Sequence, residues 1–576
     1  MALIRSLSRP LSVALLAAAA APLLAAAPAR AQPADVPPGA EPGLTAAEVE
    51  EIARKAVADA LAAEKATQEA EAKAAADAKA AQEAEDAKAH DGDYLKGAGG
   101  FTDVRLAFTL TNENVLAKPG ETIPSVPGWR FGRPNSLGTL FFDNYDTRFS
   151  GYETLSHAIM YRNYRRDHME VEGAFVMRIN EIAERRIDLS DAGSYVLVSW
   201  WKDPEHKDPT RWSFTAFPVS SDRFRLGYSY RLSWGGNEEY RRSGQAVPGF
   251  KLQYTGGKAY AFVGAKTAVL LDSSTAEQVA KQAVLAGAGY DVSPELRLEV
   301  NGGYFNRGSN ELEDVNQEDV QLFGVSAQAA YHKGMPVASS VDYSLYKYDP
   351  ERIGRVFNKA KYPGGLSYLA MTELTYLGQT LKDPENTGST KVQPGIAGDL
   401  NLRVMYDRLR VRFDAQYRDL AFILHSVPSL PTYSDFPEAY DIKPNFFAAA
   451  GVDRNYDDRL TLGMVVGVEI PASLTTPTGI PGDTSATGEA TAVIRNNGQQ
   501  TLITVLPEGE EPAAQLALKG SAQLDFGDIY SALVDVYYSY DPNQTRLTRE
   551  GPEDTFKYEF GEFNQLGANI TLQAKF

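Results

Sequence analysis

The last eleven residues of the chain, 566–576, alternate strictly between apolar and polar side chains. Every second position is apolar (Leu566, Ala568, Ile570, Leu572, Ala574 and Phe576). The positions between them are glycine or polar (Gly567, Asn569, Thr571, Gln573 and Lys575). Because successive side chains of a β-strand point to opposite faces of a sheet, one face of this strand is apolar and the other is wettable. The pattern predicts a strand at the boundary between an apolar and a polar environment.

This terminal strand resembles the closing strand of bacterial outer-membrane barrels, which the assembly machinery reads as an alternating strand with a final phenylalanine. Gly567, Ile570, Leu572 and Phe576 carry the resemblance. The resemblance implies that the barrel-assembly machinery is a partner of the chain. The alternative is the last strand of a soluble β-sandwich.

The amino-terminal residues, 1–31, have the features of a secretory signal peptide. Arg5 and Arg9 precede an apolar stretch over 11–27, and small residues flank Arg30 in the sequence Ala29-Arg30-Ala31. This order of charge, apolar stretch and small-residue site is typical of an export signal that is removed. No later apolar run reaches the roughly 20 residues that a membrane-spanning helix needs. We therefore expect an exported chain that is periplasmic, secreted or a barrel.

Three further segments precede the region rich in strand patterns. Residues 32–43 are Pro-rich and read as a linker, residues 44–90 are Ala-rich with charges, and residues 91–100 form a second linker. Apolar residues at helical spacing over 49–61 predict a periplasmic helix that assembles into a coiled coil. The alternatives are a solvated single helix or a tether toward the cell wall, which would make peptidoglycan a partner.

From residue 101 to 576 the period of the pattern is two, which predicts an all-β transmembrane barrel of about 16–18 antiparallel strands after the helical segment. Tight turns alternate along this region with long connections, as they do in outer-membrane barrels. The strand count is uncertain near 193–218 and 366–406, where one strand too many or too few falls between turns. The clearest predicted strands are Arg223–Trp234, Lys258–Lys266, Glu295–Tyr304, Gln321–Tyr331, Asp399–Tyr406, Arg408–Arg418, Gln515–Phe526 and Ile529–Tyr540.

Two of these strands carry arginines on one face and apolar side chains on the other. An arginine on the lipid face near the bilayer midplane costs about 2–4 kcal/mol, so the arginine face should line water. A barrel of 16 or more strands is wide enough to leave an aqueous channel. The predicted pore-lining residues are Arg223, Arg225, Arg231, Arg403, Arg408, Arg410, Arg412, Asp414 and Arg418.

These arginines allow two interpretations. The first is an eyelet that attracts anionic solutes. The second is that they pair with carboxylates inside the barrel, such as Asp414, Glu170 and Glu299. A related question is which connection narrows the pore. Residues 419–443, with an apolar and Pro-rich run, are one candidate, although that run would also suit packing against another subunit.

Catalysis, metal binding and nucleic-acid binding have little support in the sequence. The six histidines are scattered, cysteine is absent, and no zinc, nucleophile-elbow or phosphate-loop motif occurs. The net charge of −18 argues against nucleic acid as a partner. We therefore expect no enzymatic activity, no metal and no cofactor.

The order of signal peptide, Ala-rich helix and large barrel resembles the sugar- and dicarboxylate-type porins that carry an amino-terminal coiled coil. The resemblance implies a homotrimer in the outer membrane of a Gram-negative cell, in contact with lipid and lipopolysaccharide, with the helix in the periplasm. It further implies passive diffusion of small hydrophilic solutes or ions, with a lean toward anions from the arginines. The alternative is a structural tether between outer membrane and cell wall, or a surface adhesin with a barrel anchor.

Overall fold

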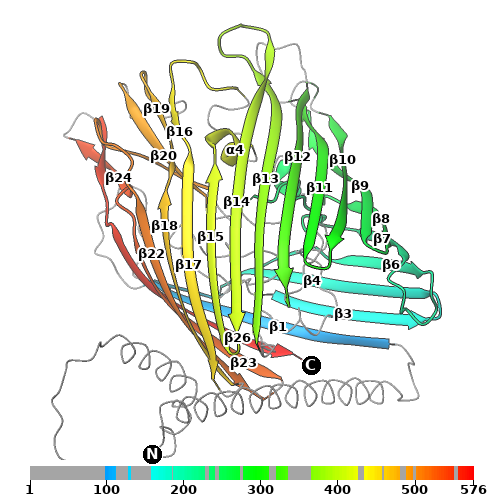
Figure 1. Cartoon of the computed structure of the whole chain (residues 1–576). Helices are drawn as coiled ribbons and strands as arrows, with labels where there is room; N and C mark the ends of the chain where they lie inside the picture. The colour runs from blue at the N-terminus through cyan, green and yellow to red at the C-terminus, as the bar shows by residue number, and fades with distance from the viewer. Residues whose placement is uncertain are drawn as a thin grey trace, which may run out of the picture. The chain divides into compact units, whose positions relative to one another are not determined.

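Eighteen antiparallel strands close into a barrel in the computed structural model (Figure 1). The sheet contains 20 strands, of which β2 (Gly128–Phe131) pairs with β1 and β5 (Arg186–Asp191) pairs with β4, both beside the ring. The remaining eighteen form the ring itself, so the fold predicted from the sequence is confirmed as a closed barrel of that size.

The described residues and the strands of the ring are as follows. The structure describes residues 98–111, 128–131, 157–183, 186–191, 193–227, 232–240, 246–272, 275, 277–309, 319–334, 365–425, 434–456, 459–480, 488–496, 501–527, 529–550 and 555–575. The ring consists of β1 (Ala98–Thr111), β3 (His157–Arg166), β4 (Met169–Ala183), β6 (Tyr195–Trp201), β7 (Arg211–Phe217), β8 (Gly249–Gly256), β9 (Ala259–Leu271), β10 (Gln278–Ser293), β11 (Leu296–Ser309), β12 (Asp319–Lys333), β13 (Leu366–Lys382), β14 (Thr390–Tyr406), β15 (Leu409–Arg418), β17 (Asn445–Tyr456), β18 (Leu460–Ile470), β22 (Gln515–Phe526), β23 (Tyr530–Tyr540) and β26 (Asn564–Lys575).

The barrel is closed by pairing between its first strand, β1, and its last strand, β26. β1 and β26 pair antiparallel from Asp103 opposite Lys575 to Thr111 opposite Gly567. The side chain of Gln573 donates a hydrogen bond to Asp103 Oδ1 across this seam, at 2.8 Å. Leu572 is 56% exposed on the outer face, whereas Thr571 is fully buried on the inner face. The two faces of the terminal strand are therefore apolar outside and polar inside, as its alternation predicts.

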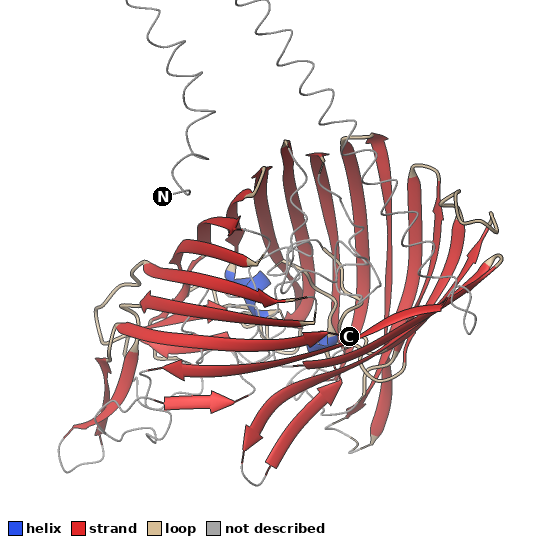
Figure 2. Cartoon of the chain, turned by 90° about the horizontal axis from the view of Figure 1, so that it is seen from below, coloured by secondary structure: helices blue, strands red, loops and turns tan. Residues whose placement is uncertain are grey.

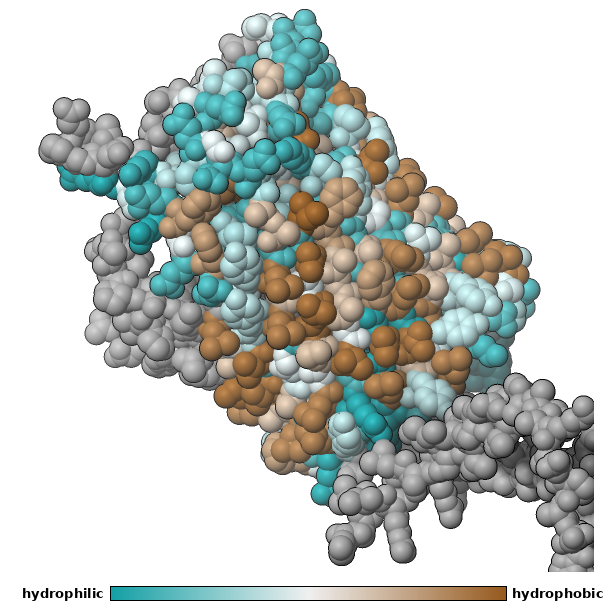
Figure 3. Space-filling model, turned by 60° about the vertical axis from the view of Figure 1, so that its left-hand side comes forward, coloured by the Kyte–Doolittle hydropathy of each residue, from teal (hydrophilic) through white to brown (hydrophobic). Residues whose placement is uncertain are grey.

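The burial pattern of the barrel is the reverse of that in a soluble protein. Large apolar side chains on the outer face are widely exposed, among them Leu374 at 61%. Charged and polar side chains such as Asp414 and Glu469 are buried on the inner face. Figure 3 shows hydrophobic residues, in brown, gathered over the strands of one face. Soluble folds bury apolar and expose charged side chains, so this surface is suited to an apolar solvent.

The two ends of the barrel differ in the length of their connections. At one end, β14 and β15 are joined through Asp407 and Arg408, and β8 and β9 through Gly257 and Lys258. Most connections at the other end are longer, and residues 419–444, 471–514 and 541–563 contain strands or a helix of their own. The predicted asymmetry of short turns and long loops is thus present, except that β12 and β13 are joined at the short-turn end through residues 334–365.

Residues 419–444 and 471–514 together build a small sheet at the long-loop end. Strand β16 (Asp441–Lys443) comes from the first segment, and β19 (Ala472–Thr476), β20 (Ala490–Asn496) and β21 (Thr501–Val505) come from the second. β20 and β21 pair as a hairpin, with Asn496 opposite Thr501. A separate hairpin joins β24 (Thr545–Glu550) to β25 (Thr555–Phe560).

Several strand boundaries differ from the sequence prediction. The predicted strand Asp399–Tyr406 is longer in the structure, because β14 begins at Thr390 and only 383–389 separate it from β13. Pro394 and Gly395 lie inside β14, although both residue types usually mark turns. The predicted strand Arg223–Trp234 is wrong: its described residues, 223–227 and 232–234, form an inward-folded loop, because their apolar side chains pack on an apolar patch of the inner wall.

Large aromatic side chains lie on both faces of the barrel wall. Trp234 and Tyr537 are almost completely buried on the inner side, whereas Trp200 and Trp212 are exposed on the outer face. Among the described residues, no helix is long and apolar enough to cross a membrane. The signal peptide, both linkers up to residue 97 and the coiled-coil helix lie outside the described residues and stay predictions.

Candidate functional site: the interior of the barrel

The connection between β7 and β8 folds into the barrel; its described residues (218–227, 232–240 and 246–248) are called the inner loop. Leu226 and Trp234 exchange two backbone hydrogen bonds, at 2.8 and 3.0 Å, which folds this part of the loop back on itself. The ring of Trp234 lies 6.3 Å from that of Phe305 on the inner face of β11. Figure 2 shows the short helices, in blue, within the ring of strands.

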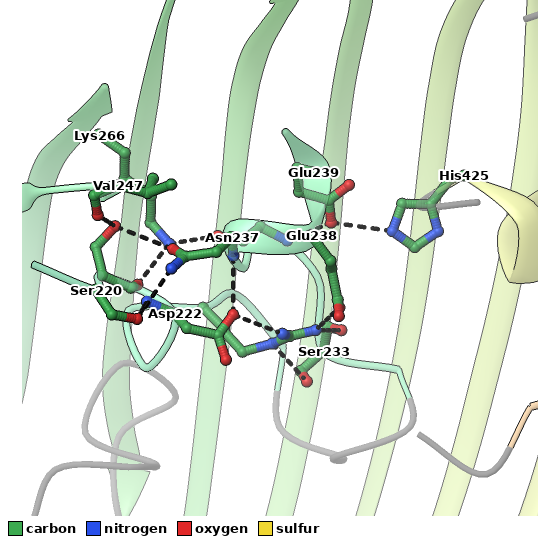
Figure 4. A network of polar contacts seen from close by, with 12 residues as sticks. Ser220, Asp222, Ser233, Asn237, Glu238, Glu239, Val247, Lys266 and His425 are labelled. Carbon is green, nitrogen blue, oxygen red and sulfur yellow. Dashed lines mark hydrogen bonds and ion pairs between the residues drawn. The ribbon is translucent and has the colours of Figure 1, made fainter. Parts of the chain in front are cut away.

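Polar contacts fix the inner loop to the wall as well. The indole Nε1 of Trp234 donates to Ser326 Oγ on β12, at 3.0 Å. The Lys266 ammonium on β9 donates to the carbonyl oxygens of Ser221 and Gly235, at 2.7 and 2.6 Å (Figure 4). Gly235 has a φ of +79°, which favours glycine at this position. Because packing and hydrogen bonds both hold it, the loop is a permanent part of the interior.

Arg225, a predicted pore-lining residue, is used inside this loop. Its guanidinium contacts Asp222 Oδ1 at 3.4 Å and Glu238 Oε1 at 2.5 Å, and it donates to the carbonyl oxygen of Ser233 at 2.9 Å (Figure 4). Arg223 lies on the same loop, next to Gly193. Arg231 lies outside the described residues. The pairing interpretation therefore suits Arg225 better than the eyelet interpretation.

A second segment folds inward between β15 and β17. The helix α4 (Leu420–Leu424) begins at Asp419, whose Oδ1 accepts a hydrogen bond from the backbone N–H of Phe422, at 2.7 Å. Four of its five residues are buried. A Cβ at Gly395 of β14 would lie 3.0 Å from Phe422 N, so glycine there permits the close approach of helix and strand. This places the start of 419–443 inside the barrel, as the constriction hypothesis predicts.

The two inward segments meet at three buried side chains. His425, directly after α4, has Nε2 3.0 Å from Oε1 of Glu239, which belongs to the 3-10 helix η2 (Asn237–Glu239) of the inner loop. Arg307 of β11 donates from Nε to the carbonyl oxygen of Glu239, at 2.6 Å, and from Nη1 to the carbonyl oxygen of His425. We call Glu239, Arg307 and His425 the loop junction.

The charges of the loop junction stabilise one another. Burial, the largest single effect, would raise the pKa of the Glu239 carboxyl, but the charge and hydrogen bond of His425, the charge of Arg307 and the backbone N–H of Gly235 together lower that pKa to about 2. Burial would likewise lower the pKa of His425, but the charge and hydrogen bond of Glu239, with the hydrogen bond to the carbonyl oxygen of Phe422, together raise that pKa above its usual value. The pair therefore favours an ionised carboxylate beside a protonated imidazole.

The remaining predicted residues lie on the inner face of β14 and β15 and, for Arg408, in the turn between them. Arg403 of β14 is directly opposite Arg412 of β15. Arg410 makes a 2.8 Å ion pair with Asp453 of β17. Asp414 accepts a hydrogen bond from Asn401, and the Arg408 guanidinium donates to the side-chain oxygen of Asn455, at 3.4 Å. Arg418 Nη2 lies 3.6 Å from Glu469 Oε1.

Arg403 and Arg412 belong to a lateral row that the sequence analysis did not identify. Following the register across β15, β17, β18 and β22, Arg412 is opposite Gly451, Gly451 is opposite Val465, and Val465 is opposite Lys519. Three cations thus share one level of the inner wall, and the two side chains between them are small or apolar. We call Arg403, Arg412 and Lys519 the cationic row.

The inner loop and the loop junction are the parts that sequence reasoning missed. Alternation over 223–234 imitates a strand, and only the density of glycine and polar residues over 235–239 signals a different structure. Glu239, Arg307 and His425 are separated by at least 68 residues, so no local pattern joins them. Within the part of the chain that the structure describes, no group of three or more potential metal ligands occurs.

Comparisons with known proteins give only distant likenesses. No protein-family model matches the chain, and no curated protein matches it. Among solved structures, OprD of Pseudomonas aeruginosa is 10% identical, with 84% of this chain and 96% of that one covered and a TM-score of 0.38. OpdL of the same organism is 8% identical, with 84% and 99% covered and a TM-score of 0.38.

A third similar structure is the trimer form of OmpT, an outer membrane protein of Vibrio cholerae. It is 11% identical, with 83% of this chain and 99% of that chain covered and a TM-score of 0.32. At these identities and TM-scores the likenesses say nothing about activity. The function is therefore inferred from the interior and the surface of the barrel itself.

Proposed function

We propose that this protein is an outer-membrane channel through which small hydrophilic solutes or ions diffuse passively. The observation that carries the proposal is the inverted burial of the closed barrel, with apolar side chains exposed outside and charged side chains inside. In lipid every backbone polar group needs an internal partner, and a closed barrel supplies one because it has no edge strands. A ring of eighteen strands encloses more space than its own inward side chains fill.

The inner loop and α4 provide the narrowing that such a channel needs. They cover the inner face of β9 to β14, where an apolar cluster including Phe262, Leu285 and Phe305 replaces the polar lining. The polar remainder of the wall, from β14 through β15 and β17, carries the arginines and the carboxylates. Solutes would pass along this polar side, with the two inward segments opposite.

The cationic row supports a channel that is selective for anions. Arg410 and Arg418 each have a carboxylate within 4 Å, and Arg403 is hydrogen-bonded through Nε to the side-chain oxygen of Asn401, at 3.1 Å. Like charges directly opposite one another on paired strands are unfavourable. Arg403 and Arg412 would be held together more favourably when an anion passes between or beside them, which raises the local anion concentration.

Selectivity measurements test this function and the role of the cationic row together. In a planar bilayer with a potassium chloride gradient, the wild-type protein should give stepwise currents and a reversal potential on the chloride side. The double variant Arg403→Gln/Arg412→Gln should keep the currents but move the reversal potential toward that of potassium, because two cations have left the wall.

Arg454→Gln is the matched control for the selectivity measurement. Arg454 lies on the outer face, with its guanidinium 5.3 Å from the ring centre of Tyr456, and its removal changes the net charge without changing the lining. The reversal potential of this variant should equal that of the wild type. A purified protein that carries no current would reject the channel, and an unchanged reversal potential in the double variant would reject the role of the cationic row.

Assembly and location follow from the same proposal. The exposed apolar face would contact the lipid and lipopolysaccharide of the outer membrane of a Gram-negative cell, with the short-turn end and the amino-terminal segment in the periplasm. Gly567, Ile570, Leu572 and Phe576 would be the signal for the barrel-assembly machinery. A homotrimer held by a coiled coil over residues 44–90, and a contact of that segment with peptidoglycan, also belong to this proposal.

A further inference from the structure

The loop junction joins three segments that are far apart in the chain and belong to different parts of the interior. Glu239 comes from the inner loop, His425 follows α4, and Arg307 stands on the wall strand β11. All three side chains are at least nine-tenths buried. A buried ion pair seldom adds net stability over apolar packing, but it can specify one arrangement of the elements that it joins. The junction therefore marks a contact whose geometry matters.

The hydrogen bonds of His425 depend on its protonation. Nδ1 faces the carbonyl oxygen of Phe422, and Nε2 faces Glu239 Oε1 at 3.0 Å. Both partners are acceptors, and a neutral imidazole carries a hydrogen on only one nitrogen. Both contacts are hydrogen bonds only when the ring carries two protons. With Glu239 ionised, the geometry thus favours the imidazolium form.

Arg307 completes the junction from the wall. Its guanidinium donates to the backbone oxygens of both Glu239 and His425, so one strand side chain holds the two inward segments at once. As a permanent cation, Arg307 still binds these two carbonyl groups when His425 is neutral. The difference between the two states of the junction is therefore the His425–Glu239 contact alone.

We propose that the loop junction is a proton-operated latch, in which protonated His425 holds α4 against the inner loop and loss of that proton to solvent weakens this contact, so that α4 moves more freely about its remaining contacts. The regulatory consequence, a pH-dependent narrowing of the pore, rests on the proposed channel function. The latch itself concerns only the distance between two segments, which is measurable without any current.

The direction of the effect follows from the charges around His425. Glu239 on η2 and Asp419 at the start of α4 are the carboxylates that act on it, and Arg307 on β11 is the opposing cation. Because the pKa of His425 is raised, the latch is closed at low pH and opens as the pH rises through that raised value. While His425 is protonated, Glu239 is ionised, since its pKa beside that charge is about 2.

Distances between spin labels in the full-length protein test the latch. The chain has no cysteine, so Ala246→Cys at the base of the inner loop and Ala421→Cys on α4 create two unique label sites. In reconstituted protein we expect a single short distance at about pH 6 and a longer, broader distribution at about pH 9, either side of the histidine range. Single-channel recordings over the same range should show the open current rising with pH.

Three substitutions make the test specific. His425→Gln should give the longer distribution at both pH values, and Glu239→Gln should lose the pH transition while retaining an acceptor at the same place. His168→Gln, on the tight turn after β3, should behave like the wild type. A wild-type distance that does not change with pH overturns the latch, and so does a transition that survives in His425→Gln.

Different experimental outcomes would reject the latch proposal and the channel proposal. A pH-dependent distance in a protein that conducts no current would retain the latch and reject the proposed function. Currents that are independent of pH, together with unchanged distances, would retain the channel and reject the latch. The wild-type distance measurement needs no substitution at the junction, so it stands even if a junction variant does not fold.

Discussion

Arg418→Met is expected to lower the free energy of unfolding by about 3–5 kcal/mol, the cost of removing one partner of a buried ion pair. Arg418 is 2% exposed and Glu469 is completely buried, and Asn445 is hydrogen-bonded to both. Without the guanidinium, the Glu469 carboxylate stays buried without the cation that neutralises it. Urea-dependent unfolding in lipid vesicles, followed by tryptophan fluorescence, measures the loss.

The double variant Arg418→Met/Glu469→Met provides the matched control. Replacing both charges with apolar side chains of similar length removes the unpaired charge, and such replacements are often neutral or stabilising. The loss in the double variant should therefore be much smaller than in either single variant, which is a large coupling energy. Additive losses would show that the two side chains act independently and that the wall at this level is well hydrated.

Val263→Arg is expected to cost about 2–4 kcal/mol, because an arginine would be placed against lipid near the middle of a spanning strand. Val263 is 48% exposed on the outer face of β9, between Leu252 and Ala286 on the neighbouring strands. The same vesicle-based unfolding experiment measures this cost. This change in the free energy of unfolding does not depend on whether the barrel conducts solutes, so it tests the environment of the outer face alone.

Leu271→Arg is the depth control for this substitution. Leu271 is 61% exposed on the same strand, at its long-loop end. An arginine near the membrane interface costs only about 0–1 kcal/mol, so Leu271→Arg should be close to wild type. Equal costs at the two positions, or none at Val263, would contradict a membrane around this face.

The strands of the barrel could be predicted from the sequence wherever one face of a strand is apolar and exposed on the outside and the other face is polar and lies inside. In β15, Leu409, Val411 and Phe413 are exposed on the outer face, and Arg410 and Arg412 lie on the inner face, as the alternation predicts. The same holds for β26. Period two is clear in these strands because their outer face carries apolar side chains and their inner face carries polar or charged ones.

The interior was harder to predict because the inner loop covers part of the inner face of the barrel, so that this part contacts protein and not water. Over β9 to β13 part of the inner face is apolar, including Leu270, Leu285 and Leu322, and the inner loop packs on this part. Residues 223–234 alternate in the same way as a spanning strand, although their apolar side meets this wall and not lipid. Alternation reports that two faces differ, but it does not report what each face touches.

The loop junction was unpredictable for a different reason. Each of its side chains is an isolated charged or titratable residue in its own stretch of sequence. Only the closure of the barrel brings β11, η2 and the end of α4 together. Contacts of this kind follow from the path of the whole chain, which local patterns do not specify.

The central claim is that each spanning strand separates water on its inner face from lipid on its outer face. Single cysteines along β15 test it directly, because the chain has no cysteine of its own. In protein reconstituted into vesicles, cysteines at positions 408, 410 and 412 should react with a small charged thiol reagent. Cysteines at positions 409, 411 and 413 should resist that reagent, and a fluorophore attached there should be quenched by labelled lipid. Equal reactivity at all six positions, or the opposite alternation, would contradict the account.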